Sequence, residues 1–294
     1  MKIIVFGGSG FLGSHVADVL TEANHQVIIF DIAPSPYLRS GQKMIVGDIL
    51  DSEAVTSAMS GCDVIYNFAG IADLDDATTK PLETIRLNVL GTCQLLQAAI
   101  ETGCKRFIYA SSLYVYSDRG GFYRCSKQAA ELYVEEYQRK HGLEFSILRF
   151  GSLYGPRSDK RNAIYRYLRQ ALINGRIVVN GTGEEMREYV HARDAAIMSC
   201  DILSPTYANK HVIISGQQMI RYNDLLLIIQ EIMNNSIAIE FHHTSSQDHY
   251  SLTPYSYTPK VGLKVTLNGY TDLGQGLLQC LAEIDFREHT TIGQ

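Results

Sequence analysis

The chain has 294 residues, 46% of them hydrophobic, and a formal net charge of −5 from 26 basic and 31 acidic residues. This is enough for one large domain or two closely joined ones, and the mild charge without blocks of one sign gives no reason to expect nucleic acid or an anionic membrane as a partner. Six scattered cysteines without a Cys-x-x-Cys pair argue against a disulfide framework or a metal site and favour a cytoplasmic location, as does the lack of a visible signal peptide or membrane-length apolar run.

Short apolar runs alternate with helical patterns over the first 150 residues. We predict strands at 3–6, 27–30, 44–46, 64–68, 107–110 and 146–150, and helices at 12–23, 52–59, 81–102 and 123–141. Most of the strands are apolar throughout, which is typical of strands covered on both faces. Pro81 fits a helix start, and Gly103 and Gly142 fit helix ends. The alternation predicts an α/β fold with a doubly wound parallel sheet of the Rossmann type.

The pattern loosens after Pro156. We expect helices at 163–174, 222–234 and 273–286, and extended segments at 177–179, 212–215 and 237–241. The chain is thus predicted to divide into a dinucleotide-binding domain at 1–155 and a smaller α/β lobe at 156–294, part of which returns to the first domain. Because small molecules often bind between lobes, we expect the substrate there.

A glycine-rich loop follows the first predicted strand. Gly8, Gly10 and Gly13 match the dinucleotide fingerprint Gly-x-Gly-x-x-Gly, and Gly7 precedes it. The first glycines permit a tight turn and a close approach of the backbone to a pyrophosphate, and the helix start offers N–H groups to phosphate. The loop residues that we expect to bind the cofactor are Gly7, Gly10, Phe11, Leu12 and Gly13. An ordinary strand–helix turn is the alternative, but the loop opens a strand–helix–strand unit.

Asp31 ends the second predicted strand, where a carboxylate accepts hydrogen bonds from the adenosine ribose. The same carboxylate repels a 2′-phosphate, and Ile32 rather than an arginine follows, so NAD is expected rather than NADP. Asp48 and Ile49, after the third strand, are expected beside the adenine. Asp48 fits equally well as the cap of the following helix.

Tyr123 and Lys127 are four residues apart and therefore share one face of a predicted helix. A tyrosine whose pKa is near 10 is too weak a base at neutral pH, and a nearby ammonium favours its phenolate. Ser112, just after the fifth strand, is placed to hydrogen-bond a substrate oxygen. Tyr-x-x-x-Lys alone is common on helix surfaces, but together with the glycine loop it predicts hydride transfer between a hydroxyl-bearing carbon and NAD.

These segments resemble the extended short-chain dehydrogenase/reductases, in particular the NAD-dependent epimerase/dehydratase family that acts on nucleotide sugars. The resemblance is carried by residues 7–13, 31, 47–49, 67–70, 88–92, 111–116, 123–127, 153–156 and 187–191. It implies that Ser112, Tyr123 and Lys127 are catalytic and that Tyr123 and Lys127 also contact NAD. The resemblance further places Phe68, Ala69, Gly70 and Asn88 at the cofactor. It also implies a homodimer through the helices near 81–102 and 123–141.

Arg187 follows Gly181-Thr182-Gly183, where the resemblance places the nucleotide diphosphate, and an arginine fork suits a pyrophosphate. A surface salt bridge with Glu184 or Glu185 is the alternative. Ser152 stands where an asparagine often contacts the substrate in the family. His249 is a candidate for a second phosphate ligand, whereas Asp194 is expected to cap a helix.

Departures from the family narrow the reaction. Its 4,6-dehydratases and decarboxylases carry acidic residues just after the catalytic Ser or Thr, and the epimerase/reductases of the GDP-fucose type carry a cysteine there, whereas this chain has Leu113 and Tyr114. The approach to Tyr123 at 117–122 is also short, which predicts an open site. We therefore expect oxidation at C4 of a nucleotide sugar by an NAD-dependent 4-epimerase. A 4-dehydrogenase or 4-keto reductase, a short-chain dehydrogenase on a small alcohol, and a non-enzymatic NAD-sensing protein are the alternatives.

Overall fold

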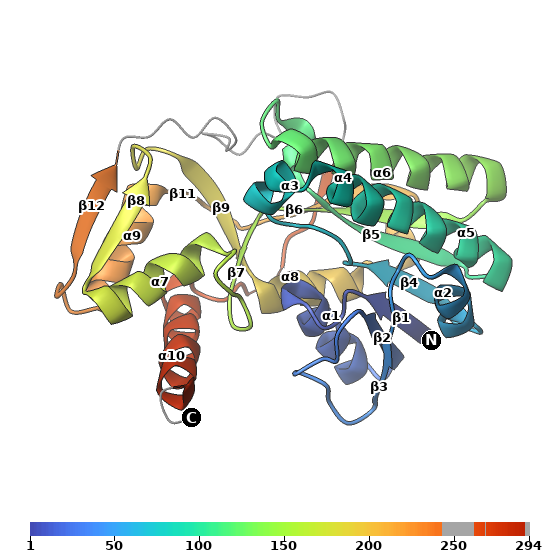
Figure 1. Cartoon of the computed structure of the whole chain (residues 1–294), viewed down its shortest axis with the longest axis horizontal. Helices are drawn as coiled ribbons and strands as arrows, with labels where there is room; N and C mark the ends of the chain where they lie inside the picture. Colours follow the sequence, from blue (N-terminus) through green and yellow to red (C-terminus); the bar gives the residue numbers. More distant parts are fainter. Residues whose placement is uncertain (243–261, 268, 292–294) are drawn as a thin grey trace.

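The computed structural model describes residues 1–242, 262–267 and 269–291. It has two lobes, with the N-terminal elements in one and α7, α9 and α10 in the other (Figure 1). Its largest element is an eight-stranded sheet whose strands are all parallel. The strands are β1 (Lys2–Phe6), β2 (Gln26–Asp31), β3 (Gln42–Val46), β4 (Val64–Asn67), β5 (Arg106–Ser112), β6 (Glu144–Phe150), β10 (Lys210–Ile214) and β13 (Leu263–Lys264).

The strand order is β13-β10-β6-β5-β4-β1-β2-β3. Six of these strands have the doubly wound order of Rossmann folds, in which the chain reverses direction across the sheet between β1 and β4. Ligands bind at the carboxyl ends of the strands at such a reversal. The predicted fold class is confirmed, and the glycine loop after β1 and Phe68 after β4 meet at this reversal.

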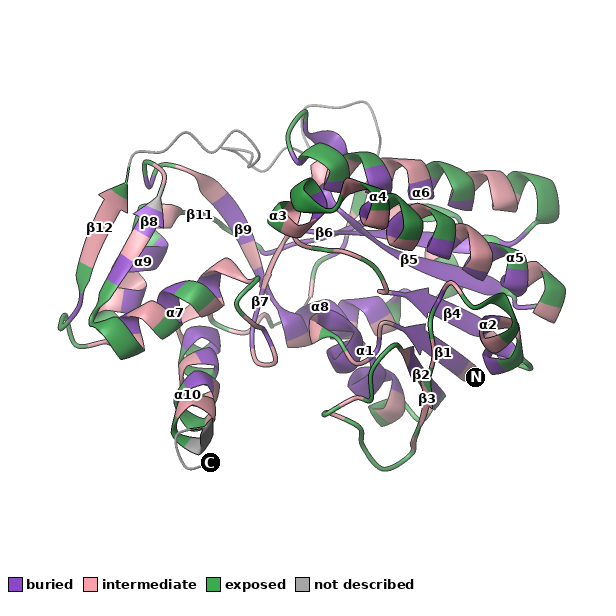
Figure 2. Cartoon of the chain, viewed as in Figure 1, coloured by how far each residue is buried: buried purple, intermediate pink, exposed green. Residues whose placement is uncertain are grey.

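Helices cover both faces of the sheet, and its central strands are buried (Figure 2). Ile3 and Val5 of β1 face one helical layer, whereas Ile4 and Phe6 face the other. The first layer holds α1 (Phe11–Glu22) and α8 (Ala192–Asp201), and the second holds α2 (Ser52–Met59), α5 (Thr92–Thr102) and α6 (Gly121–His141). Both β1 faces are apolar because both are covered.

The smaller lobe has its own buried core. Its helices are α7 (Ala163–Asn174), α9 (Tyr222–Ile232) and α10 (Leu273–Thr291). Two small sheets complete it, one with β7 (Ser152–Tyr154), β9 (Met186–His191) and β11 (Met219–Arg221), the other with β8 (Arg176–Asn180) and β12 (Ala238–His242). Among the described residues, no helix has the length and apolar composition needed to cross a membrane.

Two glycines mark where the chain passes between the large sheet and the small one. A Cβ on Gly151, between β6 and β7, would lie 2.9 Å from Ser215 Cβ, and a Cβ on Gly216 would lie 2.2 Å from the Tyr189 carbonyl oxygen. Gly151 also donates its N–H to the Ile214 carbonyl at 2.8 Å. The two segments that pass between the sheets, at Gly151 and Gly216, therefore lie in direct contact with neighbouring strands. A side chain does not fit at either glycine.

The predicted helix at 81–102 is confirmed in its bounds, but it is not α-helical throughout. It consists of α4 (Pro81–Thr84), a π-helical segment (Ile85–Gly91) and α5. The sequence pattern also missed α3 (Leu74–Thr79) and the short strands of the β7-β9-β11 sheet. Helix ends at Gly103 and Gly142 are confirmed, because both adopt the left-handed conformation, at φ +70° and +73°.

Candidate functional site

The glycine loop is packed too tightly for side chains. A Cβ on Gly13 would lie 2.2 Å from the Gly7 carbonyl oxygen, and one on Gly7 would lie 2.6 Å from Ala69 N. Gly7 also has φ +76°, a conformation that favours glycine. Phe11 and Leu12 begin α1, whose first N–H groups lack intrahelical acceptors and can face a phosphate. The loop thus has the cradle that a dinucleotide needs.

The Asp31 carboxylate lies at this cradle, since its Oδ2 accepts a hydrogen bond from Ser9 N at 2.9 Å. Ile32, the next residue, is 72% exposed. Arg39, on the segment between β2 and β3, is directed to α1 instead, where its guanidinium pairs with Asp18 and Glu22 at 2.9 Å each. The arrangement favours a free ribose over a 2′-phosphate because a carboxylate is adjacent and Arg39 is engaged.

Asp48 does not cap the following helix. Its Oδ1 accepts from Leu50 N at 2.9 Å, and the cap of α2 is Asp51, which accepts from Ala54 N at 3.0 Å. Asp48 is exposed, whereas Ile49 is buried and fills the space in which a Cβ on Gly91 would stand, 2.5 Å from Ile49 Cδ1. The cap alternative is therefore wrong.

Phe68, Ala69 and Gly70 continue β4 past the glycine loop, and Phe68 donates its N–H to Phe6 O at 2.8 Å. Asn88 lies beneath this segment and is 1% exposed. Its Oδ1 accepts from Ile71 N at 2.8 Å, and its Nδ2 donates to Ile71 O and to Ser126 Oγ at 2.9 Å each. Both amide protons are therefore bonded within the protein, and Asn88 supports the loop at Ile71. Its contact with the cofactor stays a prediction.

Ser112 and Tyr123 are both 8% exposed, at the end of β5 and the start of α6. Ser112 Oγ accepts from Tyr114 N at 3.3 Å, and the Tyr114 and Tyr123 rings meet edge to face, 6.1 Å between centroids. Lys127 Nζ lies 5.8 Å from the Tyr123 ring centroid and donates to Ala110 O at 2.8 Å. Tyr123 and Lys127 thus share one face of α6, as their spacing predicts.

Lys127 is buried, and this burial lowers the pKa of its ammonium to about 8, while the Glu131 carboxylate acts in the opposite direction. Tyr109, whose ring centroid lies 5.0 Å from Nζ, has its pKa raised well above the usual value by burial. Tyr109 therefore stays neutral, and the positive charge beside Tyr123 is that of Lys127. This charge favours the phenolate of Tyr123.

Ser152 and Arg187 lie on the small β7-β9-β11 sheet, whose strand β7 directly follows β6 of the large sheet. Ser112 pairs with Phe150 across β5 and β6, and two residues later Ser152 begins β7 opposite Tyr189 of β9. Arg187, two residues from Tyr189 and on the same face of β9, is 5% exposed with its guanidinium 5.7 Å from the Tyr222 ring centroid. Arg187 is thus buried rather than on the surface.

Two further predictions concern Asp194, expected to cap a helix, and His249, expected as a second phosphate ligand. Asp194 is not a helix cap: His191 caps α8, and Asp194 accepts hydrogen bonds from Thr271 N and Oγ1 at 2.8 and 2.9 Å. His249 lies outside the described residues.

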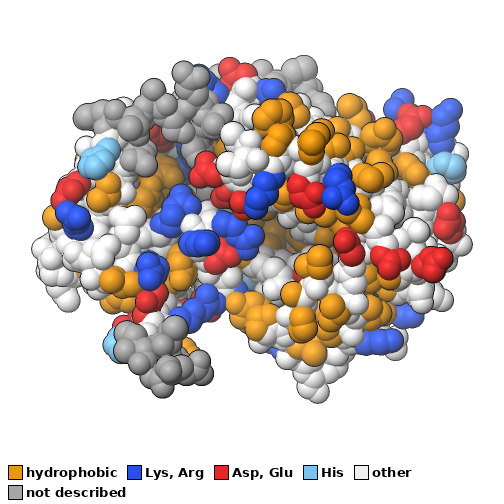
Figure 3. Space-filling view, in the orientation of Figure 1, with side chains coloured by type: hydrophobic (Ala, Val, Ile, Leu, Met, Phe, Trp, Pro, Cys, Tyr) orange, Lys and Arg blue, Asp and Glu red, His pale blue; other side chains and the backbone are white. Residues whose placement is uncertain are grey.

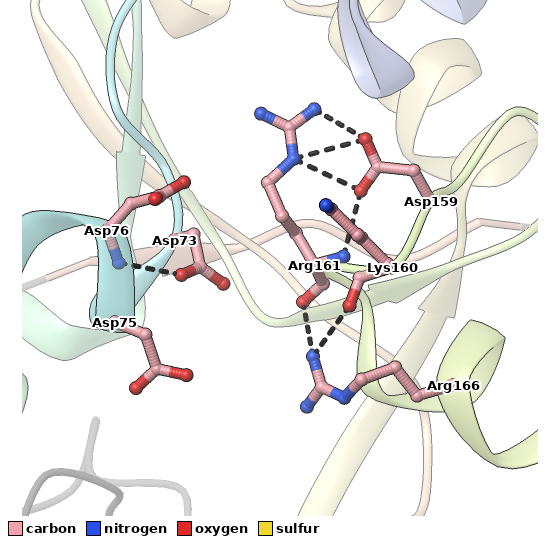
Figure 4. A pocket seen from close by; sticks show the side chains of 7 residues that line it. All are labelled: Asp73, Asp75, Asp76, Asp159, Lys160, Arg161 and Arg166. Carbon is pink, nitrogen blue, oxygen red and sulfur yellow. Dashed lines mark hydrogen bonds and ion pairs between the residues drawn. The ribbon is translucent and has the colours of Figure 1, made fainter.

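A cavity of about 750 Å³ lies between α3 and the segment that leads into α7 (Figure 4). Charged side chains line it: Asp73, Asp75, Asp76, Asp159, Lys160, Arg161 and Arg166. Blue side chains gather at the same junction of the two lobes in Figure 3. Its described lining includes none of Ser112, Tyr123 or Lys127. The described residues contain no group of His, Cys, Asp and Glu side chains arranged to hold a metal ion.

Residues 3–213 match the model of the NAD dependent epimerase/dehydratase family. The chain belongs to this family. The resemblance read from the sequence is confirmed, and so is NAD as the cofactor, because the family is NAD-dependent and the glycine cradle with Asp31 fits a dinucleotide.

Curated relatives include both reaction types of the family. The chain is 28% identical over 224 residues to a dTDP-glucose 4,6-dehydratase from Streptomyces antibioticus, a match that spans 66% of each chain. It is 27% identical over 254 residues to a putative UDP-glucose 4-epimerase from Methanocaldococcus jannaschii, which spans 78% of this chain and 81% of the relative. The relatives alone therefore do not separate epimerase from dehydratase.

Solved structures share the fold over nearly the whole chain. UDP-glucuronic acid 4-epimerase from Bacillus cereus, in complex with UDP-glucuronic acid and NAD, superposes with a TM-score of 0.84 at 22% identity and covers 98% of this chain and 100% of that one. UDP-glucose 4-epimerase from Thermotoga maritima, with UDP-glucose, gives a TM-score of 0.83 at 22% identity, with 99% and 100% covered. At 22% identity, these likenesses show that the chain has the same fold as the two epimerases.

Proposed function

We propose that the protein is a 4-epimerase of a nucleotide-diphosphate sugar. The observation that carries this is that Tyr123 lies beside the Lys127 ammonium and, through Tyr114, next to Ser112. Tyr123 takes the proton of the C4 hydroxyl, Ser112 hydrogen-bonds the C4 oxygen, and Lys127 favours the tyrosinate. NAD, when bound, would supply a hydride acceptor for C4. Inversion requires that the 4-keto sugar turn its other face to the nicotinamide before the hydride returns. Tyr123 then gives its proton back to the oxygen on the inverted carbon.

The two residues after Ser112 support epimerisation over dehydration. Leu113 is fully buried beside Val115, and Tyr114 lies against the Tyr123 ring. Water elimination across C5 and C6 needs an acid and a base, and neither side chain can transfer a proton as a carboxylate does at neutral pH. We therefore propose that the protein is not a 4,6-dehydratase, although relatives with that activity exist.

The test is to incubate the purified protein with UDP- and GDP-sugars and to follow both the sugar product and the nicotinamide absorbance. A C4 epimer without net NADH supports the 4-epimerase. Accumulation of NADH or of a keto sugar supports a 4-dehydrogenase instead, and net NADH consumption with a 4-keto sugar supports a reductase. Turnover of small alcohols alone, or NAD binding without any turnover, points to the two remaining alternatives.

Arg187→Ala tests whether the substrate carries a diphosphate. We expect KM for the nucleotide sugar to rise about 10–100-fold with a smaller change in kcat, because a charge-assisted bidentate contact is lost. Arg221→Ala is the matched control: it lies on the neighbouring strand β11, and its exposed guanidinium is 3.7 Å from Glu184. An unchanged KM in Arg187→Ala removes the reason for a nucleotide substrate.

We also propose a homodimer through α4, α5 and α6. Large apolar side chains are exposed on these helices and the π-helical segment: Leu82 at 76%, Ile85 at 53%, Leu90 at 50%, Leu132 at 54% and Tyr133 at 49%. Hydrophobic side chains gather over this part of the surface (Figure 3). An apolar patch of this kind on a folded protein marks an interface.

Leu132→Glu is expected to convert this dimer to a monomer, because each dimer would bury two unpaired carboxylates. Light scattering after gel filtration measures the mass. Leu227→Glu, at an exposed apolar position on α9 in the other lobe, is the control and should leave the mass unchanged. A wild-type monomer across the micromolar range would contradict the proposal.

Three earlier predictions stay predictions: the domain boundary at 155, the open site behind the short segment 117–122, and the cytoplasmic location. In support of the last, all six cysteines are free thiols.

A further inference from the structure

A buried ion pair lies one helical turn beyond Lys127. Glu131 and Arg149 are both completely buried, and the guanidinium binds the carboxylate through Nε at 3.0 Å and NH2 at 2.7 Å. Ser111 donates its hydroxyl to Glu131 Oε1 at 2.6 Å. The Glu131 carboxylate is therefore fixed in place by three hydrogen bonds from two strands.

The sheet register brings this pair to the catalytic lysine. Ser111 pairs with Arg149 across β5 and β6, so both side chains point to the same face of the sheet. The preceding residue, Ala110, provides the carbonyl that accepts from Lys127 Nζ at 2.8 Å. Lys127 and Glu131, four residues apart on α6, are thus held by two consecutive residues of one strand.

Fold stability alone does not account for such a pair. Removing two charges from water is costly, and well-packed apolar residues in their place are often as stable or more so. A buried lysine, in turn, tends to lose its proton because burial penalises the charged form. A fixed carboxylate one turn away opposes that loss.

We propose that Glu131 is a positioning residue for Lys127, which it holds as an ammonium at the Ala110 carbonyl beside Tyr123. Arg149 and Ser111 act through Glu131 by keeping its carboxylate in place. The inference deepens the proposed function, because it rests on the role of Lys127 in that chemistry. The direction agrees with the electrostatics of the site, where Glu131 raises the pKa of Lys127 against the larger effect of burial.

Other titratable groups face this pair from every neighbouring element. Tyr109 of β5 and Tyr123 of α6 lie beside Lys127. Tyr116, after β5, lies within 2.5 Å of Arg149 NH1. His211 of β10 hydrogen-bonds Glu135 at 2.9 Å, and burial lowers its pKa, so it stays neutral near pH 8. Glu131 is thus the carboxylate of α6 whose charge acts on the Lys127 ammonium.

The test is a titration of Lys127 itself, in the absence of substrate and cofactor. The protein is labelled with ¹³C-lysine, and the Cε resonance of Lys127 is assigned from its loss in Lys127→Met. In the wild type we expect a midpoint near pH 8. In Glu131→Gln the midpoint should fall by about 1–2 pH units, because an opposite charge is removed. Glu135→Gln, one turn further along α6, is the matched control and should leave the midpoint unchanged.

Two further variants keep the test decisive if Glu131→Gln does not fold. Glu131→Gln/Arg149→Met replaces the ion pair by a neutral one and should also lower the midpoint. Glu131→Asp keeps the carboxylate, so its Lys127 midpoint should lie close to that of the wild type. Midpoints that match the wild type in the neutral variants overturn the inference.

The titration also separates this inference from the proposed function. If Lys127 shifts as expected but no nucleotide sugar is turned over, the inference stands and the 4-epimerase proposal fails. If epimerase activity is present but the Lys127 midpoint is unchanged in Glu131→Gln, the 4-epimerase proposal stands and the inference about Glu131 fails. With an active substrate, the rate of Glu131→Gln should approach that of the wild type near pH 6 and fall about tenfold behind it near pH 9, because only the protonated lysine supports Tyr123. A uniform loss at every pH would indicate a purely structural role.

Discussion

Tyr123→Phe is expected to lower kcat for the nucleotide sugar by roughly a thousandfold, the scale of general acid–base catalysis. The substitution removes only the phenolic hydroxyl, so the ring that packs edge to face on Tyr114 stays in place. The fold and NAD affinity should therefore be retained. Steady-state rates measure the loss, calorimetry measures NAD binding, and circular dichroism confirms the fold.

Tyr133→Phe is the matched control for this prediction. Tyr133 lies on the same helix but is 49% exposed, so its hydroxyl should be dispensable for the reaction. Wild-type rates in Tyr123→Phe would mean that another group takes the C4 proton.

Gly13→Ala is expected to weaken NAD binding about a hundredfold and to lower the free energy of unfolding by about 2–3 kcal/mol. The added Cβ would fall 2.2 Å from the Gly7 carbonyl oxygen, which is backbone and cannot rotate away. Either α1 or the loop has to move, and both form the phosphate cradle. Calorimetry with NAD and urea denaturation measure the two losses.

Gly103→Ala separates the two effects. Gly103 has φ +70°, so alanine there costs stability through backbone strain, but no atom lies within 4 Å of the added Cβ and the residue ends α5, away from the cradle. This variant should lose stability and keep its affinity for NAD. Gly13→Ala with unchanged NAD affinity would show that the loop does not form the phosphate site.

Local chemistry made the cofactor half of the site predictable from sequence. Gly7 to Gly13, Asp31 and the Tyr123–Lys127 spacing each follow from what one strand, turn or helix can do, and the structure places them as expected. Failures occurred where distant residues decide. Asp194 binds Thr271, 77 residues away, and so is not a cap.

The Glu131–Arg149 pair shows the same limit. From the sequence pattern alone, Glu131 resembles any surface charge of an amphipathic helix. Arg149 resembles a polar interruption of an apolar strand. Only the register of β5 against β6 and the packing of α6 above them bring the two side chains together. The short strands of the β7-β9-β11 sheet, at three to six residues each, likewise depend on their partners rather than on their own pattern.

The crossings at Gly151 and Gly216 bear on how this enzyme can change its substrate. A side chain added at Gly151 would meet Ser215, and one added at Gly216 would meet the Tyr189 carbonyl, so the junction between the lobes tolerates little change at either glycine. Ser152 follows Phe150, the partner of Ser112 on β6, by two residues and pairs with Tyr189, two residues from Arg187. If the protein is the proposed epimerase, a new sugar preference is expected to arise through side chains around Ser152 and Arg187 rather than through the two glycines of the junction.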